Sequence, residues 1–168
     1  MNRIDERLGD SAMKPLPDAT ARDEYDAVIV RTDYTDHSAW QEVVRLLTAK
    51  ESEWTSDVHL VEDPAWAGVG VDEVVAAASG KELSVVFLAD SITMRADHHA
   101  VLAVTTKTRE DCESDEEWEY EIGYGREFRT VPAAVHEIHG NRELGNMDFQ
   151  DFSGCAHLDP DRVFRGFV

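Results

Sequence analysis

Short apolar runs that end at an acidic residue recur three times in the first half of the chain. The clearest is Leu83–Asp90, and the runs Ala27–Asp33 and Val58–Asp63 end in the same way. Apolar runs of this length that do not alternate with polar residues are typical of strands buried on both faces of a sheet. We therefore predict three buried strands, at about 26–31, 57–62 and 83–90.

Helical spacing follows the first of these strands. After Asp36, which can cap a helix, apolar residues recur on one helical face: Trp40, Val43, Val44 and Leu47. This pattern predicts a helix over about 37–49, and a shorter helix is expected from Asp72 to Gly80. Residues 26–90 therefore have the order β-α-β-α-β, in which the crossover connections make the three strands parallel.

The second half of the chain predicts two more strands, at about 100–106 and 126–131, which are joined as a hairpin. Between them lies an acidic insertion, residues 108–125. Within 118–124, aromatic or aliphatic residues alternate with glutamates and a glycine, and a period of two is the pattern of a strand. We predict that this segment extends the hairpin with one aromatic face and one acidic face.

Together these elements predict a single α/β domain over residues 24–168. Its mixed sheet has about five strands, a parallel β-α-β-α-β core plus a β-hairpin. Residues 133–146 fit either a short helix or a strand with a turn, and 147–155 predict a short C-terminal helix. Residues 1–23 are polar, carry two prolines and show no apolar period, so we expect a flexible N-terminal tail.

The charge of the chain narrows the classes of partner. There are 35 acidic and 16 basic residues among 168, which gives a formal net charge of −19. Such a surface disfavours nucleic acid and anionic membranes and favours basic proteins or cations, although the charge can also serve solubility alone. No apolar run reaches the roughly eighteen residues of a membrane span, and the N-terminus lacks the apolar segment of a secretory signal. We therefore expect a cytoplasmic protein whose two cysteines stay reduced.

The acidic insertion supports a first functional hypothesis, a non-catalytic interaction module that binds a basic protein and blocks or regulates it. The candidate contact residues are Asp115, Glu116, Glu117, Trp118 and Tyr120. In this hypothesis the carboxylates steer the partner and the aromatic residues anchor it; alternatively, the aromatic residues cover the domain's own core. Bacterial immunity proteins that neutralise basic nuclease toxins have a similar size and charge, which is an analogy and not evidence of common descent.

The acids near the predicted strand ends support a second hypothesis, a divalent-metal-dependent phosphotransfer or hydrolytic enzyme. Asp33, Asp36, Asp63 and Asp90 follow strands whose carboxyl ends share one edge of the sheet, where open α/β sheets bind their ligands. Carboxylates that converge there could hold Mg²⁺ or Mn²⁺. The competing interpretation is that these residues cap helices and start turns, since aspartate is favoured in both roles and the chain has no glycine-rich phosphate loop.

Histidine and cysteine give weaker candidates. His136 and His139 lie three residues apart and could share a metal ion on a helix, but Gly140 argues against a regular helix there. Cys112 lies among carboxylates, which raise the pKa of a thiol, and Cys155 has no established base beside it. The sequence therefore predicts neither a zinc centre nor a catalytic cysteine.

Four segments of the chain resemble a family of small acidic bacterial proteins described as a domain of unknown function. They are Val30–Asp33, Glu62–Gly68, Gly145–Phe152 with the motif NMDFQDF, and Asp161–Phe167 with the motif VFRGF. The resemblance covers about residues 25–167 and implies no particular activity. The acidic stretch 108–125 is longer here than in the relatives, so a role for it is not carried over from them.

Overall fold

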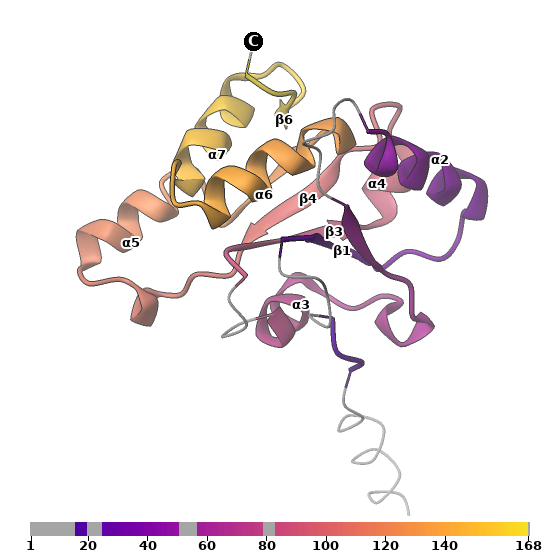
Figure 1. The fold of residues 1–168 in the computed structure, drawn as a ribbon, viewed down its shortest axis with the longest axis horizontal. Coiled ribbons are helices and arrows are strands. Elements are labelled where there is room, and N and C mark those ends of the chain that lie inside the picture. The colour runs from indigo at the N-terminus through magenta and orange to yellow at the C-terminus, as the bar shows by residue number, and fades with distance from the viewer. Residues whose placement is uncertain (1–15, 20–24, 51–56, 79–82, 168) are drawn as a thin grey trace, which may run out of the picture.

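A mixed sheet forms the centre of the domain in the computed structural model, which describes residues 16–19, 25–50, 57–78 and 83–167 (Figure 1). Its spatial order is β2-β1-β3-β4-β5-β6. The strands are β1 (Ala27–Arg31), β2 (Val58–Val61), β3 (Val85–Ala89), β4 (Val101–Thr105), β5 (Glu127–Thr130) and β6 (Val163–Phe164). The predicted α/β class is confirmed.

The parallel half of the sheet has the predicted topology. Strand β1 pairs in parallel with β2 on one side and with β3 on the other, and β4 runs antiparallel to both of its neighbours. The chain adds a sixth strand that the sequence did not predict, β6, which pairs in parallel with β5. Two residues are too few to show the period of a strand, so only its pairing with β5 identifies it.

Helices cover both faces of the sheet (Figure 1). The helices are α2 (His37–Thr48), α3 (Val71–Ala78), α4 (Ser91–Arg95), α5 (Asp115–Glu121), α6 (Val135–Glu143) and α7 (Phe149–Leu158). Short 3₁₀ turns lie at η1 (Pro64–Trp66), η2 (Arg109–Asp111) and η3 (Pro132–Ala134). Helices α2, α6 and α7 lie on one face, and α3 lies on the other. No helix of the described ranges is long and apolar enough to span a bilayer.

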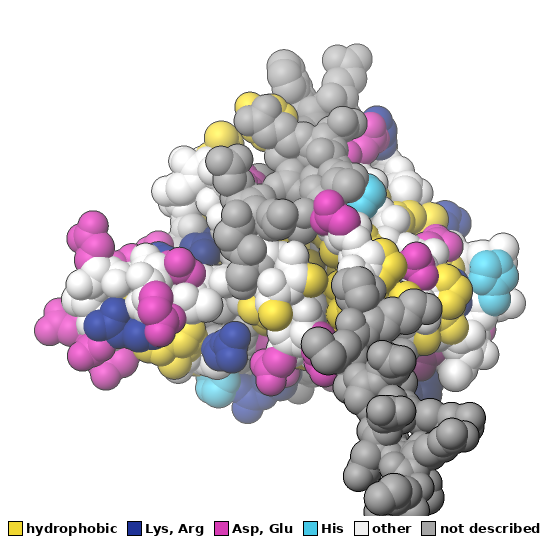
Figure 2. Space-filling view, turned by 90° about the horizontal axis from the view of Figure 1, so that it is seen from below, with side chains coloured by type: hydrophobic (Ala, Val, Ile, Leu, Met, Phe, Trp, Pro, Cys, Tyr) yellow, Lys and Arg dark blue, Asp and Glu magenta, His cyan; other side chains and the backbone are white. Residues whose placement is uncertain are grey.

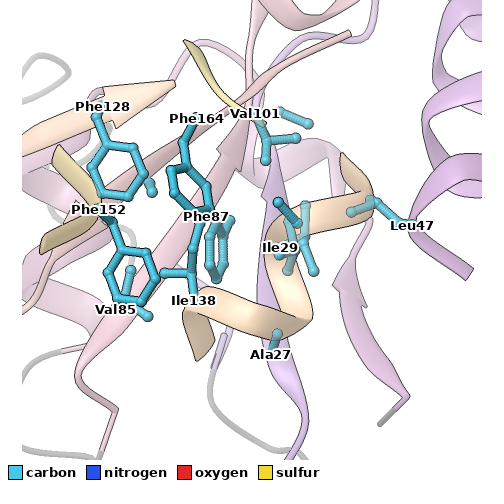
Figure 3. Packing of buried hydrophobic residues seen from close by; sticks show 14 of the residues in the cluster. Ala27, Ile29, Leu47, Val85, Phe87, Val101, Phe128, Ile138, Phe152 and Phe164 are labelled. Atoms are coloured by element: carbon cyan, nitrogen blue, oxygen red, sulfur yellow. The ribbon is translucent and has the colours of Figure 1, made fainter. Parts of the chain in front are cut away.

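The larger core lies between the sheet and helices α2, α6 and α7. Figure 3 shows Phe128, Phe152 and Phe164 packed beside Phe87 of β3. The rings of Phe152 and Phe164 meet edge to face, with centroids 5.4 Å apart. This arrangement is a favourable one for aromatic rings, and it ties the C-terminal residues to the middle of the sheet.

The smaller core lies under α3 and η1, and it includes part of the predicted N-terminal tail. Ala19 is 1% exposed, and Leu16 packs against the same cluster as Trp66 and Val74. The expectation of an unpacked tail is therefore wrong for residues 16–19, where the side chains of Leu16 and Ala19 pack into this core. The rest of 1–23 lies outside the described residues, as does Gly80, the predicted end of α3.

The acidic insertion differs from the prediction. Residues 115–121 form helix α5, so the predicted alternating strand over 118–124 is wrong. The side chain of Ser114 accepts a hydrogen bond from the backbone N–H of Glu117, and three acids occupy the first turn, where the helix dipole favours negative charge. The ambiguous segment 133–146 is also mainly helical, and α6 runs through Gly140 without a break.

Candidate functional site

Helix α5 projects from the end of the sheet, beside α6 and α7 (Figure 1). It begins at Asp115, after the turn η2 that follows β4, and ends at Glu121, shortly before β5. The connection between β4 and β5 therefore forms a helix that points away from the sheet, and it does not extend the two strands. This position makes α5 the most prominent acidic element of the structure.

A buried ion pair holds the base of α5 on the domain. Glu121 Oε1 lies 2.9 Å from a terminal nitrogen of Arg142 on α6, and the two side chains are 4% and 9% exposed. The hydroxyl of Thr105, at the end of β4, donates a second hydrogen bond to Glu121 Oε1 at 2.8 Å. Because a buried carboxylate is stable only when it is paired and hydrogen-bonded, this contact fixes the position of the helix.

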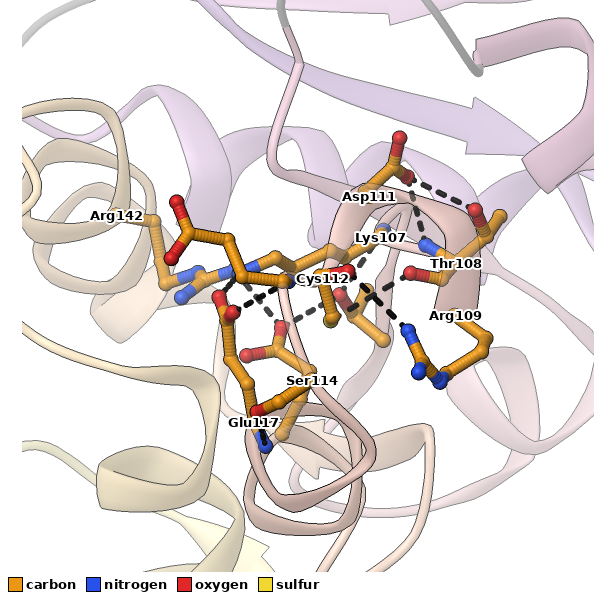
Figure 4. Close-up of polar contacts among 11 residues, drawn as sticks. Lys107, Thr108, Arg109, Asp111, Cys112, Ser114, Glu117 and Arg142 are labelled. Atoms are coloured by element: carbon orange, nitrogen blue, oxygen red, sulfur yellow. Dashed lines mark hydrogen bonds and ion pairs between the residues drawn. The ribbon is translucent and has the colours of Figure 1, made fainter.

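Two further ion pairs fasten the start of α5, and Figure 4 shows the one between Lys107 and Glu117. Lys107 Nζ lies 2.9 Å from Glu117 Oε1, and a guanidinium nitrogen of Arg109 lies 2.5 Å from Asp115 Oδ1. The hydrogen bond between Lys107 and Glu117 raises the pKa of the lysine and lowers the pKa of the glutamate. Of the predicted contact residues, Glu117 and Asp115 therefore each have an ion-pair partner within the domain.

Cys112 lies behind this network and is nearly buried. Burial raises the pKa of its thiol, and Glu117 and Glu121 raise it further, against the opposing charges of Lys107 and Arg109. Its Sγ contacts the carbonyl oxygen of Thr108 at 3.6 Å. A protonated, enclosed thiol is a poor nucleophile, which agrees with the sequence-based expectation for this residue.

The outer side of α5 presents carboxylates to solvent. Asp115, Glu116 and Glu119 are exposed, and the side chain of Asp115 is 82% exposed in spite of its contact with Arg109. Figure 2 shows acidic side chains gathered at this end of the molecule. Glu116 and Glu119 form no ion pair with any residue in the described ranges.

The aromatic residues of the insertion fall into two groups. Trp118 is half-buried, whereas Tyr120 is 48% exposed and Tyr124 is 49% exposed. The ring of Tyr124 packs at a tilt against that of His157 of α7, with centroids 5.1 Å apart. Its ring also lies 3.1 Å from where a side chain at Gly154 would begin, so the glycine allows this close contact. Exposed aromatic surface therefore lies next to the exposed acids of α5.

The four acids near the strand ends have separate local partners. Asp33 accepts hydrogen bonds from the backbone and the hydroxyl of Thr35 at 2.9 and 2.7 Å. Asp36 caps α2, as predicted from its position, and Asp63 caps η1. These three carboxylates thus perform the capping and turn-forming roles of the competing interpretation.

Asp90 forms the strongest contact of the four. It caps α4, and its two oxygens accept hydrogen bonds from both terminal nitrogens of Arg129 at 2.8 and 2.7 Å. Burial alone raises the pKa of Asp90, but the hydrogen bonds and charge of Arg129, with the hydrogen bonds of Thr93, outweigh burial and leave the pKa below its usual value. The sequence did not reveal this pairing, because Arg129 lies 39 residues further along the chain.

A metal centre is not apparent within the described part of the chain, where no three His, Cys, Asp or Glu residues are grouped to hold an ion. His136 and His139 differ in their surroundings: a ring nitrogen of His136 lies 3.3 Å from the carbonyl oxygen of Leu47, while His139 is 3% exposed inside the domain. The hypothesis of a site for Mg²⁺ or Mn²⁺ stays a prediction without a supporting contact.

The comparisons with known proteins identify a family and no activity. A family model described as a domain of unknown function, DUF6924, matches residues 26–167. No curated protein matches the chain. The matched range includes every strand and helix named above.

Proposed function

The chain belongs to the DUF6924 family, whose description states no activity, and from the geometry of α5 we propose that it binds a basic protein partner through this helix. The proposal describes an acidic interaction module of the immunity or inhibitor type, which covers a basic surface on another protein. Nucleic acid is not the proposed partner, because phosphate groups are repelled by a chain with a formal net charge of −19.

The observation that carries the proposal is the division of α5 into a fixed side and a free side. Glu121 is buried against Arg142, and Glu117 is paired with Lys107. Glu116 and Glu119, on the same short helix, remain exposed and without an ion pair in the described structure. A charged surface that is already held in place loses little conformational freedom when a partner binds, so more of the contact energy contributes to affinity.

The kinds of side chain at this surface match two separate steps of association. Exposed carboxylates attract a basic partner over distances up to about 8 Å at physiological salt and thereby raise the association rate. Exposed aromatic side chains such as Tyr120 and Tyr124 supply the apolar contacts that slow dissociation. Trp118 is half-buried, so part of its side chain packs within the domain and part is available to a partner.

The test compares two variants of equal charge. The first replaces Glu116 and Glu119 by their amides; the second does the same to Glu73 and Asp97, which are exposed acids outside α5 that also form no ion pair within the described ranges. Each variant removes two negative charges from the formal total of −19. Circular dichroism and thermal melting are used to check that both variants keep the fold.

Basic proteins from the source organism are captured on the wild-type chain, and those that bind are purified. Their association rates are then measured over a salt titration. We expect the α5 variant alone to slow association, by about tenfold or more, and to weaken its dependence on salt. If both variants bind equally, the charge acts through the whole surface and α5 is not the binding site.

A further inference from the structure

Arg31 occupies an unusual position at the carboxyl end of β1. The residue is 4% exposed, and its guanidinium carbon lies 4.2 Å from the ring centre of Tyr34 and 5.1 Å from that of Trp40. Contacts of this length between a guanidinium and an aromatic ring are cation–π contacts. Two aromatic rings thus contact the guanidinium at the start of the connection from β1 to α2.

The hydrogen-bonding capacity of this group is mostly unused. Its Nε donates to the carbonyl oxygen of Asp33 at 2.9 Å, which is the one hydrogen bond of the guanidinium within the described ranges. Among the same residues Arg31 forms no ion pair. The terminal nitrogens are not among the fully buried polar atoms without a partner in these ranges, so they reach the surface and are open to a ligand.

Tyr34 provides a second, independent observation at the same place. Its hydroxyl oxygen is buried and has no hydrogen-bond partner within the described structure. Burial raises the pKa of this hydroxyl; the charge of Arg31 opposes the shift, and the charges of Glu62 and Asp63 add to it. The hydroxyl is therefore protonated at neutral pH and able to donate a hydrogen bond.

The position in the fold is one where open α/β sheets bind ligands. Strand β1 lies between β2 and β3, and the two connecting helices α2 and α3 lie on opposite faces. The chain therefore reverses direction across the sheet beside the carboxyl end of β1, which is a topological switch point. A hydrogen bond holds the loop after β2 at the same edge of the sheet: the N–H of Gly68 donates to the carbonyl oxygen of Thr32 at 2.8 Å.

The chemistry of the surrounding groups restricts the ligand. The Nε of Arg31 already donates to Asp33, so only its two terminal nitrogens are available to a ligand. Two such nitrogens in one plane match the two oxygens of a carboxylate. Glu62 lies at the same edge, where it accepts the indole N–H of Trp40 at 2.8 Å, and its negative charge and that of Asp63 reach Tyr34. Negative neighbours disfavour a dianionic phosphate and favour a ligand that adds no net negative charge.

We propose that Arg31 and Tyr34 bind the carboxylate of a small zwitterionic ligand of the free amino acid class, with its ammonium group toward Glu62 and Asp63. The guanidinium supplies a two-nitrogen contact to the carboxylate, and the Tyr34 hydroxyl supplies a further donor. The two aromatic rings keep the guanidinium in place before the ligand arrives. This site does not depend on the function proposed for α5.

The test follows the indole N–H signal of Trp40 by two-dimensional NMR, because this group is hydrogen-bonded to Glu62 at the proposed site. The full chain is titrated separately with the standard free amino acids, with acetate and with inorganic phosphate. We expect at least one amino acid to give a saturable shift with a dissociation constant below about 10 mM. Acetate and phosphate should bind at least about tenfold more weakly.

Three variants connect the signal to the proposed residues. Tyr34→Phe, which removes only the unpaired hydroxyl, should weaken the amino acid about tenfold, and Arg31→Lys should weaken it further because lysine has no planar fork. Tyr120→Phe removes a hydroxyl on α5 and should change nothing. If Arg31→Lys does not fold, the affinity of Tyr34→Phe for the amino acid alone tests the proposal.

Several results would overturn the proposal. They are the absence of saturable binding by every amino acid, equal or tighter binding of acetate or phosphate, or an unchanged affinity in Tyr34→Phe. If no amino acid binds saturably, Arg31 and Tyr34 only pack the β1–α2 connection and do not form a ligand site.

Discussion

Glu121 and Arg142 connect the acidic helix to the rest of the domain through a buried contact of 2.9 Å between Oε1 and a terminal guanidinium nitrogen. The two residues lie on different helices, α5 and α6, and 21 positions apart in the chain. Thr105 at the end of β4 adds a hydrogen bond to the same carboxylate oxygen. The position of the proposed binding surface therefore depends on one pair of charges inside the domain.

Replacing Glu121 by Ala should destabilise the protein strongly. The change leaves Arg142 buried without its carboxylate, and breaking one side of such a pair costs about 3–5 kcal/mol. Urea denaturation measures the change in the free energy of unfolding. Glu119→Ala, two residues earlier on the exposed side of α5, should change that free energy by less than about 0.5 kcal/mol. Equal effects of the two substitutions would contradict the anchoring role of Glu121.

The pair of Asp90 and Arg129 should give the protein a defined sensitivity to acid. The folded-state pKa of Asp90 is lowered, so its contribution to stability is present above the unfolded-state pKa of about 3.9. That contribution is lost as the pH falls below this value and through the lower folded-state pKa. Asp90→Asn should therefore be less stable than the wild type at pH 7, and the difference should shrink toward pH 2.

The measurement is the free energy of unfolding in urea at a series of pH values. Asp97→Asn, which removes an exposed carboxylate near α4, is the control and should show no such convergence. If the difference between Asp90→Asn and the wild type does not change with pH, the contact with Arg129 does not stabilise the folded state through charge.

Phe152 should be essential to the larger core. It is fully buried, and its ring contacts Phe164 and Phe167 at centroid distances of 5.4 and 5.6 Å. Truncation to Ala removes a buried aromatic side chain and should cost about 3–5 kcal/mol of unfolding free energy. Phe167→Ala should cost clearly less, because this residue is 45% exposed. Chemical denaturation of both variants measures the difference.

The N-terminal segment that contains Ala19 should contribute to stability. Ala19 is 1% exposed under the smaller core, so Ala19→Asp places a carboxylate in an apolar site and should lower the melting temperature by several degrees. Ala133→Asp, at an exposed position of η3, serves as the matched control and should have little effect. An unchanged melting temperature in Ala19→Asp would show that residues 16–19 separate from the domain at low cost.

The sequence predicts the parallel half of the sheet well because its signals are local. Apolar runs mark β1, β2 and β3, and Asp36 with the spacing of Trp40 and Leu47 marks α2. The insertion is harder, because the alternation of aromatic residues and glutamates from 118 to 124 has the period of a strand. A local signal for the helix is present in Ser114 and Glu117, whose spacing is that of a helix N-cap followed by an acid.

The candidate sites depend on contacts that no local pattern contains. Glu121 appears in the sequence as one more acid of a charged stretch, and its burial follows only from the position of Arg142 on α6. Arg31 appears as a polar interruption of a strand, and its aromatic neighbours are brought to it by the loop and by α2. Both cases need the tertiary structure, because the partners lie on different elements of the fold.

Strand β6 has a consequence for the order in which the chain folds. Phe164 packs against Phe128 and Phe152, so the larger core receives one of its central rings from a late part of the sequence. The parallel strands β1, β2 and β3, with α3 beneath them, consist only of earlier residues. During synthesis the face under α3 can therefore assemble first, while the opposite face keeps its apolar residues open to chaperones until the C-terminal segment emerges from the ribosome.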